Sequence, residues 1–131
     1  MRKGLKEIVK YRLEQAEESL KDASILFDSE GSFRSVINRS YYAMFYATLA
    51  LIAEQGTGRS KHTGVISIFD REYVRKNIFP KEMSKMIHKS FNLRQESDYK
   101  EFNIIAKEDA QKIMIGAEDF VKRIKAYLQQ Q

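Results

Sequence analysis

The sequence predicts an all-α protein, built as an antiparallel up-and-down bundle of four to five helices. Apolar residues recur at helical spacing in several long segments. A single proline interrupts the 131-residue chain, and the six glycines lie mostly between those segments. Helical segments that are joined by short loops pack as antiparallel neighbours. We expect one domain over residues 1–131, which is long enough to bury a core without disulfides or metals.

The expected helices follow in order along the chain. The first spans residues 4–28, and an Asp-Ser-Glu-Gly stretch interrupts its pattern. Ser32 can cap the second helix, over residues 33–54, which should end before the Gly-Thr-Gly of residues 56–58. The rest of the chain predicts three more helices and their connections: helices at 63–74, 80–95 and 106–129, a turn at 77–80, and polar loops at 58–64 and 95–103.

Composition narrows the kinds of site that the protein can hold. The sequence has no cysteine, so disulfides and thiolate metal sites are excluded. It lacks Glu-x-x-His pairs, HExxH and glycine-rich phosphate loops, so we expect no metal and no cofactor. The net charge of +5 weakly favours an anionic partner. The first residues show no secretory signal, and the longest uncharged run, residues 40–53, is too short for a membrane span, so we expect a cytoplasmic protein.

The second expected helix is apolar on more than one side. A helical wheel divides its residues into two groups. One group holds Val36, Ser40, Met44, Ala47 and Leu51, and the other holds Asn38, Arg39, Tyr42, Tyr46 and Leu49, with Ala43, Ala50 and Ala53 beside them. One side can face the core, and the other needs a cover. Because small alanines allow close approach, we expect a homodimer that packs partly along this helix.

Arg39 is the unexpected residue in that helix. It shares one face with Tyr42 and Tyr46, at positions i, i+3 and i+7. A guanidinium is costly to bury unless it meets an anion. Two interpretations stay open. Arg39 forms an ion pair with Asp98 or a glutamate and fixes the packing of the bundle, or it belongs to an anion site at a dimer cleft, with tyrosine hydroxyls as further donors.

Three stretches of the sequence, in order along the chain, carry a family resemblance. They are NRSYYAMFYATLALI from residue 38, SKHTGVISIFDREYV from residue 60 and LRQESDYKEF from residue 93. Together they resemble the HEPN family, the higher eukaryotes and prokaryotes nucleotide-binding domain. The third is similar to that family's Arg-x-x-x-Asp-Tyr segment, here Arg94, Asp98 and Tyr99, and the closing AEDFVKRIKAYL also agrees. The resemblance covers nearly the whole chain, and it implies a four- to five-helix bundle that dimerises along its second and third helices.

The resemblance also implies an activity. Many HEPN proteins are metal-independent ribonucleases, often toxins paired with a small nucleotidyltransferase-like antitoxin. Their active site is an arginine and a histidine with four to six residues between them, duplicated across the dimer cleft. Here the arginine would be Arg39, and Tyr46 stands where the histidine would be. A phenol has a reference pKa near 10, so tyrosine is a poor base at pH 7. General acid–base catalysis typically contributes about 10² to 10⁴ to a rate, so this substitution argues against the usual nuclease.

The two histidines and a basic stretch add alternatives. His62 could swing toward the cleft and replace the missing imidazole, or it could be a solvated or capping residue. His88 is expected at the surface or facing a partner. Residues 70–89 carry six basic and three acidic side chains. They predict either a solvated helix face or an RNA-backbone track, with Tyr73 or Phe79 as a stacking platform.

Three hypotheses for function follow. The leading one is a homodimer that binds nucleotide or RNA with little or no catalysis and acts with a nucleotidyltransferase-like protein. The second is a metal-independent endoribonuclease toxin, with Arg39, Tyr46 and His62 as candidate catalytic residues. The third is a non-catalytic module that binds a protein partner. The candidate ligand-binding residues are Asn38, Arg39, Tyr42, Tyr46, Arg94, Asp98 and Tyr99.

Overall fold

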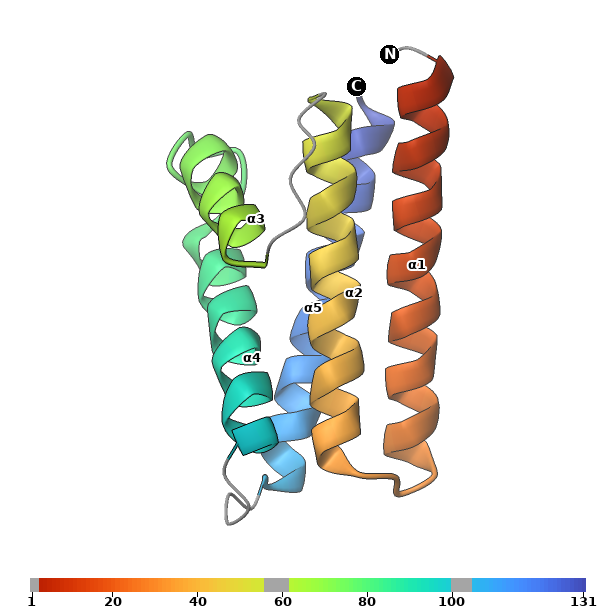
Figure 1. Ribbon diagram of the computed structural model, residues 1–131, viewed down its shortest axis with the longest axis vertical. Coiled ribbons are helices and arrows are strands. Elements are labelled where there is room, and N and C mark those ends of the chain that lie inside the picture. The colour runs from red at the N-terminus through yellow and green to blue at the C-terminus, as the bar shows by residue number, and fades with distance from the viewer. Residues whose placement is uncertain (1–2, 56–61, 100–104) are drawn as a thin grey trace.

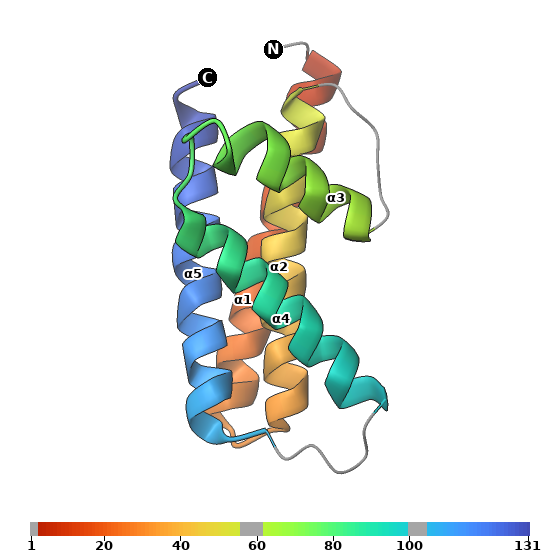
Figure 2. The same ribbon diagram turned by 90° about the vertical axis from the view of Figure 1, so that its left-hand side faces the viewer.

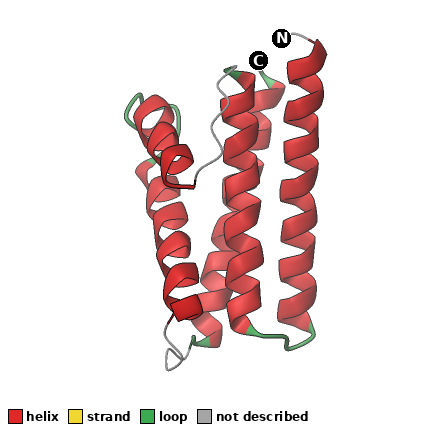
Figure 3. Ribbon diagram, viewed as in Figure 1, coloured by secondary structure: helices red, strands yellow, loops and turns green. Residues whose placement is uncertain are grey.

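The computed structural model describes residues 3–55, 62–99 and 105–131, with the side chains of residues 6–55, 64–95 and 105–131. Every regular element in these ranges is helical (Figure 3). The elements are α1 (Lys3–Asp28), α2 (Phe33–Glu54), α3 (His62–Phe69), a π-helical segment η1 (Asp70–Val74), α4 (Lys81–Tyr99) and α5 (Lys107–Gln129). The predicted all-α bundle is confirmed. No described helix is long and apolar enough to cross a membrane.

α2 is the central helix of the bundle. It contacts α1, α3, α4 and α5. In Figure 1, α1 lies on one side of α2, and α3 and α4 lie on the other. Figure 2 shows α3 and α4 running obliquely across the same side of the bundle, while α1, α2 and α5 follow its long axis. The apolar surface of α2 is therefore covered largely by helices of its own chain.

The turn between α1 and α2 follows from its local sequence. Glu30 adopts a left-handed conformation with φ of 58°. The Gly31 N–H donates a hydrogen bond of 2.7 Å to the Leu26 carbonyl oxygen, and a Cβ at Gly31 would lie only 3.0 Å from that oxygen. A side chain at this position would force Leu26 to shift by a few tenths of an ångström, so the close approach favours glycine. As predicted, Ser32 caps α2, since its Oγ accepts a hydrogen bond of 3.3 Å from the Ser35 N–H.

The helix predicted over residues 63–74 has two hydrogen-bonding patterns. α3 continues directly into η1, where the Arg75 N–H donates to the Asp70 carbonyl oxygen at 2.9 Å, five residues earlier. The Tyr73 hydroxyl donates a hydrogen bond of 3.2 Å to the Leu51 carbonyl oxygen of α2. This bond and the buried Tyr73 ring attach η1 to the central helix.

Two predicted connections have different outcomes. The turn at 77–80 is present, with Asn77 left-handed at φ of 60°, and α4 begins directly after it. The loop predicted at 95–103 is wrong in its first part, because α4 continues through Tyr99. Gln and Glu favour helices, and residues 95–99 contain no glycine or proline that would end one. Residues 100–104 of that predicted loop, and the glycines of residues 56–58, lie outside the described residues.

α2 is apolar on more than one side because the core of the protein surrounds it. One predicted side of α2 is fully buried, with 0% exposure: Val36, Ser40, Met44, Ala47 and Leu51. The other side was expected to use Ala43, Ala50 and Ala53 for close approach of a second copy. That role is wrong for Ala43 and Ala50, since both are also 0% exposed within the chain itself, and it stays a prediction for the half-buried Ala53. Ala43 and Ala50 are part of the packing that surrounds α2 on several sides.

Candidate functional site

Four half-buried side chains follow one another along α2 among buried neighbours. They are Asn38, Arg39, Tyr42 and Tyr46, which we call the α2 strip. The guanidinium carbon of Arg39 lies 5.2 Å from the centre of the Tyr42 ring. The centres of the Tyr42 and Tyr46 rings are 5.8 Å apart. The helical spacing seen in the sequence thus brings these side chains into a continuous series of contacts.

Arg39 lacks a charged partner within the described part of the chain. Its Nε and Nη2 atoms donate hydrogen bonds of 3.2 and 2.8 Å to Oδ1 of Asn38. An amide oxygen accepts hydrogen bonds but carries no charge. No described glutamate or aspartate lies within ion-pair distance of Arg39. The side chain of Asp98, the other predicted partner, lies outside the described residues.

Arg94 reaches the same aromatic ring from α4. Its guanidinium carbon lies 5.1 Å from the ring centre of Tyr41, 5.5 Å from that of Tyr42 and 5.7 Å from that of Phe91. The Tyr42 ring is therefore within 5.5 Å of two guanidinium carbons, one from α2 and one from α4. Sequence reasoning did not connect Phe91 with this site. Its spacing of i, i+3 from Arg94 was the available signal.

Three predicted site residues have side chains outside the described set. Asp98 and Tyr99 belong to the last turn of α4, and His62 is the first residue of α3. Their roles stay predictions.

The described residues of the site supply hydrogen-bond donors, positive charge and aromatic faces. Burial raises the pKa of the Tyr41 phenol above its ordinary value, and the nearby charge of Arg94 partly opposes that rise. Tyr41 is thus an uncharged neighbour, and the charges described at the site are those of Arg39 and Arg94. Arginine, tyrosine and asparagine are not ordinary general bases near neutral pH. This set of groups is suited to binding an anion that carries an aromatic ring.

A second polar cluster joins η1 to α4, and the sequence did not reveal it. Asp70 accepts a hydrogen bond of 2.6 Å from the Ser84 hydroxyl at Oδ1, and its Oδ2 lies 2.7 Å from Nε2 of His88. The His88 side chain is 49% exposed, which confirms its predicted place at the surface. Only the i, i+4 spacing of Ser84 and His88 was visible beforehand. Among the described residues, no three potential metal ligands gather in one place.

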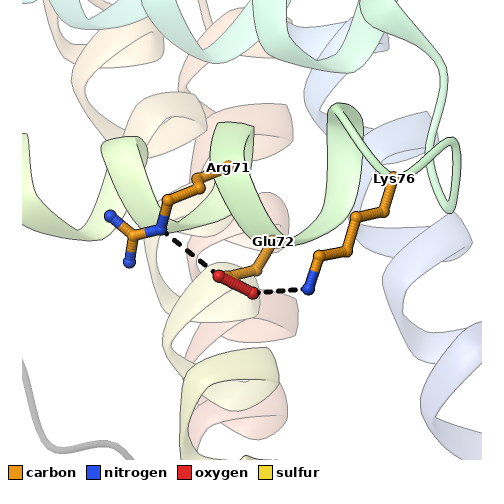
Figure 4. A network of polar contacts seen from close by, with 3 residues as sticks. All are labelled: Arg71, Glu72 and Lys76. Carbon is orange, nitrogen blue, oxygen red and sulfur yellow. Dashed lines mark hydrogen bonds and ion pairs between the residues drawn. The ribbon is translucent and has the colours of Figure 1, made fainter.

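Two basic side chains of residues 70–89 are paired with an acidic one. Arg71 and Lys76 both contact Glu72, at 3.3 and 2.8 Å (Figure 4). Hydrogen bonds from Lys76 and then Arg71 lower the pKa of the Glu72 carboxyl. In one of the two alternatives for this stretch, the RNA track, Tyr73 or Phe79 would be a stacking platform. That part of the alternative is wrong, because the two side chains are 1% and 6% exposed and lie in the core.

Comparison with known proteins agrees with the resemblance seen in the sequence. Residues 9–127 match the HEPN domain family. A UPF0332 protein of Thermotoga maritima is 34% identical over 122 residues, which is 93% of this chain and 92% of that protein. Two proteins of Methanocaldococcus jannaschii, each named "Putative toxin", are 35% identical over 130 residues and 33% identical over 116 residues. These matches cover 99% and 88% of this chain and 96% and 78% of the two proteins. The chain therefore belongs to the HEPN domain family.

Proposed function

We propose that this HEPN protein binds a nucleotide or RNA in a cleft between two copies of the chain, with the α2 strip of each copy lining the cleft. The observation that carries the proposal is the environment of Arg39. Its guanidinium is half-buried and, among the described residues, contacts the Asn38 amide and the Tyr42 ring without an ion-pair partner. A bound anion would offset the cost of that partly buried charge.

Phosphate is the anion that fits this environment best. A guanidinium presents a planar fork of donors that matches phosphate oxygens, and two of its N–H groups already hold Asn38. Arg94 adds a second positive charge beside the Tyr42 ring. The half-buried rings of Tyr42 and Tyr46 can stack on a base, as aromatic side chains do in single-strand binding proteins. Phosphate and base together define a nucleotide or an RNA strand.

The proposal includes a dimer because of the α2 strip and the family resemblance, and no longer because an apolar side of α2 needs a cover. α2 needs no second copy to cover Ala43 or Ala50, which pack inside the chain. In the middle of this helix, the half-buried α2 strip is the part left for a partner, while further accessible residues lie at its two ends. The family resemblance implies dimerisation along the second and third helices. Two facing strips would bring two Arg39 side chains near each other, and a phosphate between them would relieve their repulsion.

We expect little or no catalysis from this cleft. Arg39 can stabilise the negative charge that develops on phosphorus oxygens during RNA cleavage. Tyr46 stands where the family resemblance places a histidine, and a phenol is a poor acid–base catalyst at neutral pH. The proposal keeps a nucleotidyltransferase-like protein as a partner, because the resemblance implies that pairing.

The second candidate is an active metal-independent endoribonuclease that acts as a toxin. The names of the two Methanocaldococcus jannaschii relatives favour it. In this case, the missing base would come from His62, at the start of α3. A third role, as a module that binds a protein partner, is compatible with either candidate.

A cleavage and binding experiment separates these candidates. Protein freed of metal is incubated in EDTA with labelled structured RNA, as wild type and as Arg39→Ala and Tyr46→His variants. The matched control is Arg34→Ala, which removes an exposed arginine of α2 that makes no described ion pair. We expect wild type to bind RNA without efficient cleavage and Tyr46→His to cleave it. Arg39→Ala should bind about 10 to 100 times more weakly, the loss typical of a hydrogen-bonded charge, and Arg34→Ala should bind as wild type does.

Each other outcome changes the assignment. If wild type cleaves and Arg39→Ala does not, the nuclease candidate replaces the proposal, and His62→Ala tests the source of the base. If Arg39→Ala binds as tightly as wild type, the α2 strip is not the binding site. If no variant binds or cleaves RNA, the protein-interaction role becomes the leading one. Co-purification with a nucleotidyltransferase-like protein from a neighbouring reading frame would support that role.

A further inference from the structure

Three lysines of α4 form an exposed basic face, which we call the lysine face. Lys81, Lys85 and Lys89 follow at i, i+4 and i+8 and are all exposed. A helix rises 1.5 Å per residue, so successive lysines are about 6 Å apart along its axis. None of the three makes an ion pair with a residue that the structure describes. In Figure 2, α4 lies across the outside of the bundle.

The lysine face does not help the helix that carries it. Lys81 is the first residue of α4, where the positive end of the helix dipole disfavours a cation. Lysines four residues apart on a helix also repel one another. Two other basic side chains of the protein do have an acidic partner one turn earlier: Lys76 contacts Glu72, and Arg123 contacts Asp119. Because helix stability does not explain the three lysines, an external anion is the better explanation.

The nearby carboxylates leave the lysine face positive. Asp70 reaches α4 from η1, but its two oxygens are taken up by Ser84 and His88 at 2.6 and 2.7 Å. Glu82 is exposed on α4 and makes no ion pair with a described residue. The lysine face therefore presents positive charge that no described side chain neutralises.

We propose that the lysine face is a track for the phosphate backbone of an RNA strand, outside the α2 strip. This inference rests on the proposed function, since it takes the ligand of the cleft to be RNA. Lysine contacts phosphate as a point charge and reads no sequence, so it adds affinity in a strongly salt-dependent way. The track would hold parts of a long strand that the cleft does not reach.

RNA fits this face better than an acidic protein does. Protein interfaces are depleted in lysine and use aromatic and other apolar residues at their centres. Among the described residues, the exposed large apolar side chains lie on α1, on α5 and in the turn before α4, and none lies on α4 itself: Ile8, Tyr11, Ile25, Ile78 and Ile115. A face of lysines without an apolar centre is suited to a flexible, uniformly charged polymer.

The test measures how salt changes the binding of two ligands, a long single-stranded oligoribonucleotide and a mononucleotide. The track variant carries K81Q, K85Q and K89Q. The matched control carries K10Q, K112Q and K122Q, which remove three exposed lysines of α1 and α5 that make no described ion pair. For the oligonucleotide, the slope of log Kobs against log salt should become less steep by about 2 in the track variant, roughly 0.7 per lysine. The control should keep the wild-type slope, and mononucleotide affinity should stay the same in both.

The possible results test the lysine track and the cleft separately. A track variant with the slope and affinity of the control overturns the track, while Arg39-dependent mononucleotide binding would leave the cleft in place. A less steep slope counts for the track only if the track variant stays folded. We expect its Tm to equal or exceed that of wild type, because neutral glutamines remove repulsion between the lysines. If polyglutamate displaces RNA from wild type more effectively than unlabelled RNA does, the face takes an acidic protein and the RNA track is wrong.

Discussion

Two aromatic clusters of this protein have similar internal packing and different surroundings. The first surrounds the α2 strip and consists of Tyr41, Tyr42, Phe45, Tyr46 and Phe91. The second joins α3, η1, α5 and the turn before α4, and consists of Phe69, Tyr73, Phe79, Phe120 and Tyr127. The ring centres of Tyr41 and Tyr42 in the first cluster are 5.4 Å apart, and those of Phe69 and Phe120 in the second are 5.2 Å apart. Both distances are usual for aromatic pairs in protein cores.

The clusters differ in charge and in exposure. Two guanidinium groups lie against the first cluster, and its Tyr42 and Tyr46 rings are half-buried. No cation lies over a ring of the second cluster among the described residues. The buried hydroxyl of its Tyr73 is satisfied by the Leu51 carbonyl oxygen. Aromatic packing with a satisfied polar group stabilises the fold. Aromatic packing beside a guanidinium that makes no ion pair with a described residue, as at Arg39, is suited to a ligand.

The largest effect that we expect is on stability, in the second cluster. Phe69 is 0% exposed and contacts Tyr73, Phe79 and Phe120. Phe69→Ala should lower the free energy of unfolding by about 3–5 kcal/mol, because the ring leaves a cavity in a packed core. Urea denaturation measures this loss. Tyr46→Ala in the first cluster is the control, and an equal loss there would remove the distinction between the clusters.

Arg39 should show the opposite behaviour. Its described contacts are one amide and one ring, so Arg39→Ala should change the free energy of unfolding by less than about 1 kcal/mol. Its effect should appear in mononucleotide affinity, measured by titration calorimetry. Arg39→Lys keeps the charge and loses the planar fork, so its affinity should fall between wild type and Arg39→Ala. A large loss of stability in either variant would make Arg39 a structural residue.

A smaller effect separates the ring of Tyr73 from its hydroxyl. Tyr73→Phe keeps the packing and removes the hydrogen bond to Leu51, so stability should fall by about 0.5–1.5 kcal/mol. Thermal unfolding with the matched variant Tyr42→Phe gives the comparison. Tyr42 is half-buried, and we expect a smaller change there. Equal changes would show that the two hydroxyls have equivalent surroundings.

The smallest effect concerns alkaline pH. Burial raises the pKa of Tyr73, and likewise that of Tyr41, above the ordinary tyrosine value near 10. Above about pH 10, the unfolded chain therefore loses these protons before the folded protein does, and the free energy of unfolding falls as pH rises. The urea concentration at the unfolding midpoint should be lower above about pH 10 than below it. Tyr73→Phe should make this dependence of the midpoint on pH less steep. Midpoints that rise with pH would contradict the buried, protonated state of both phenols.

Local sequence was enough to predict most of the helices and one part of the site. The second helix was predicted over residues 33–54, and α2 has those bounds. Its cap at Ser32 and the contacts along the α2 strip also follow from spacing within one helix. Helical periodicity, capping and i, i+3 contacts depend on neighbours within a turn or two, which the sequence contains directly.

The parts that sequence reasoning missed depend on contacts between helices. The approach of Arg94 to Tyr42 and the link from Asp70 to His88 each join residues from different elements. The burial of Phe79 depends in the same way on α5 closing over the turn before α4. The sequence by itself thus determined most of the helices, the absence of cysteine ligands and the row of Arg39, Tyr42 and Tyr46 along α2. Only the tertiary structure decided which aromatic residues pack away from charge and which lie beside Arg39 and Arg94, because that depends on which faces the helices turn toward one another.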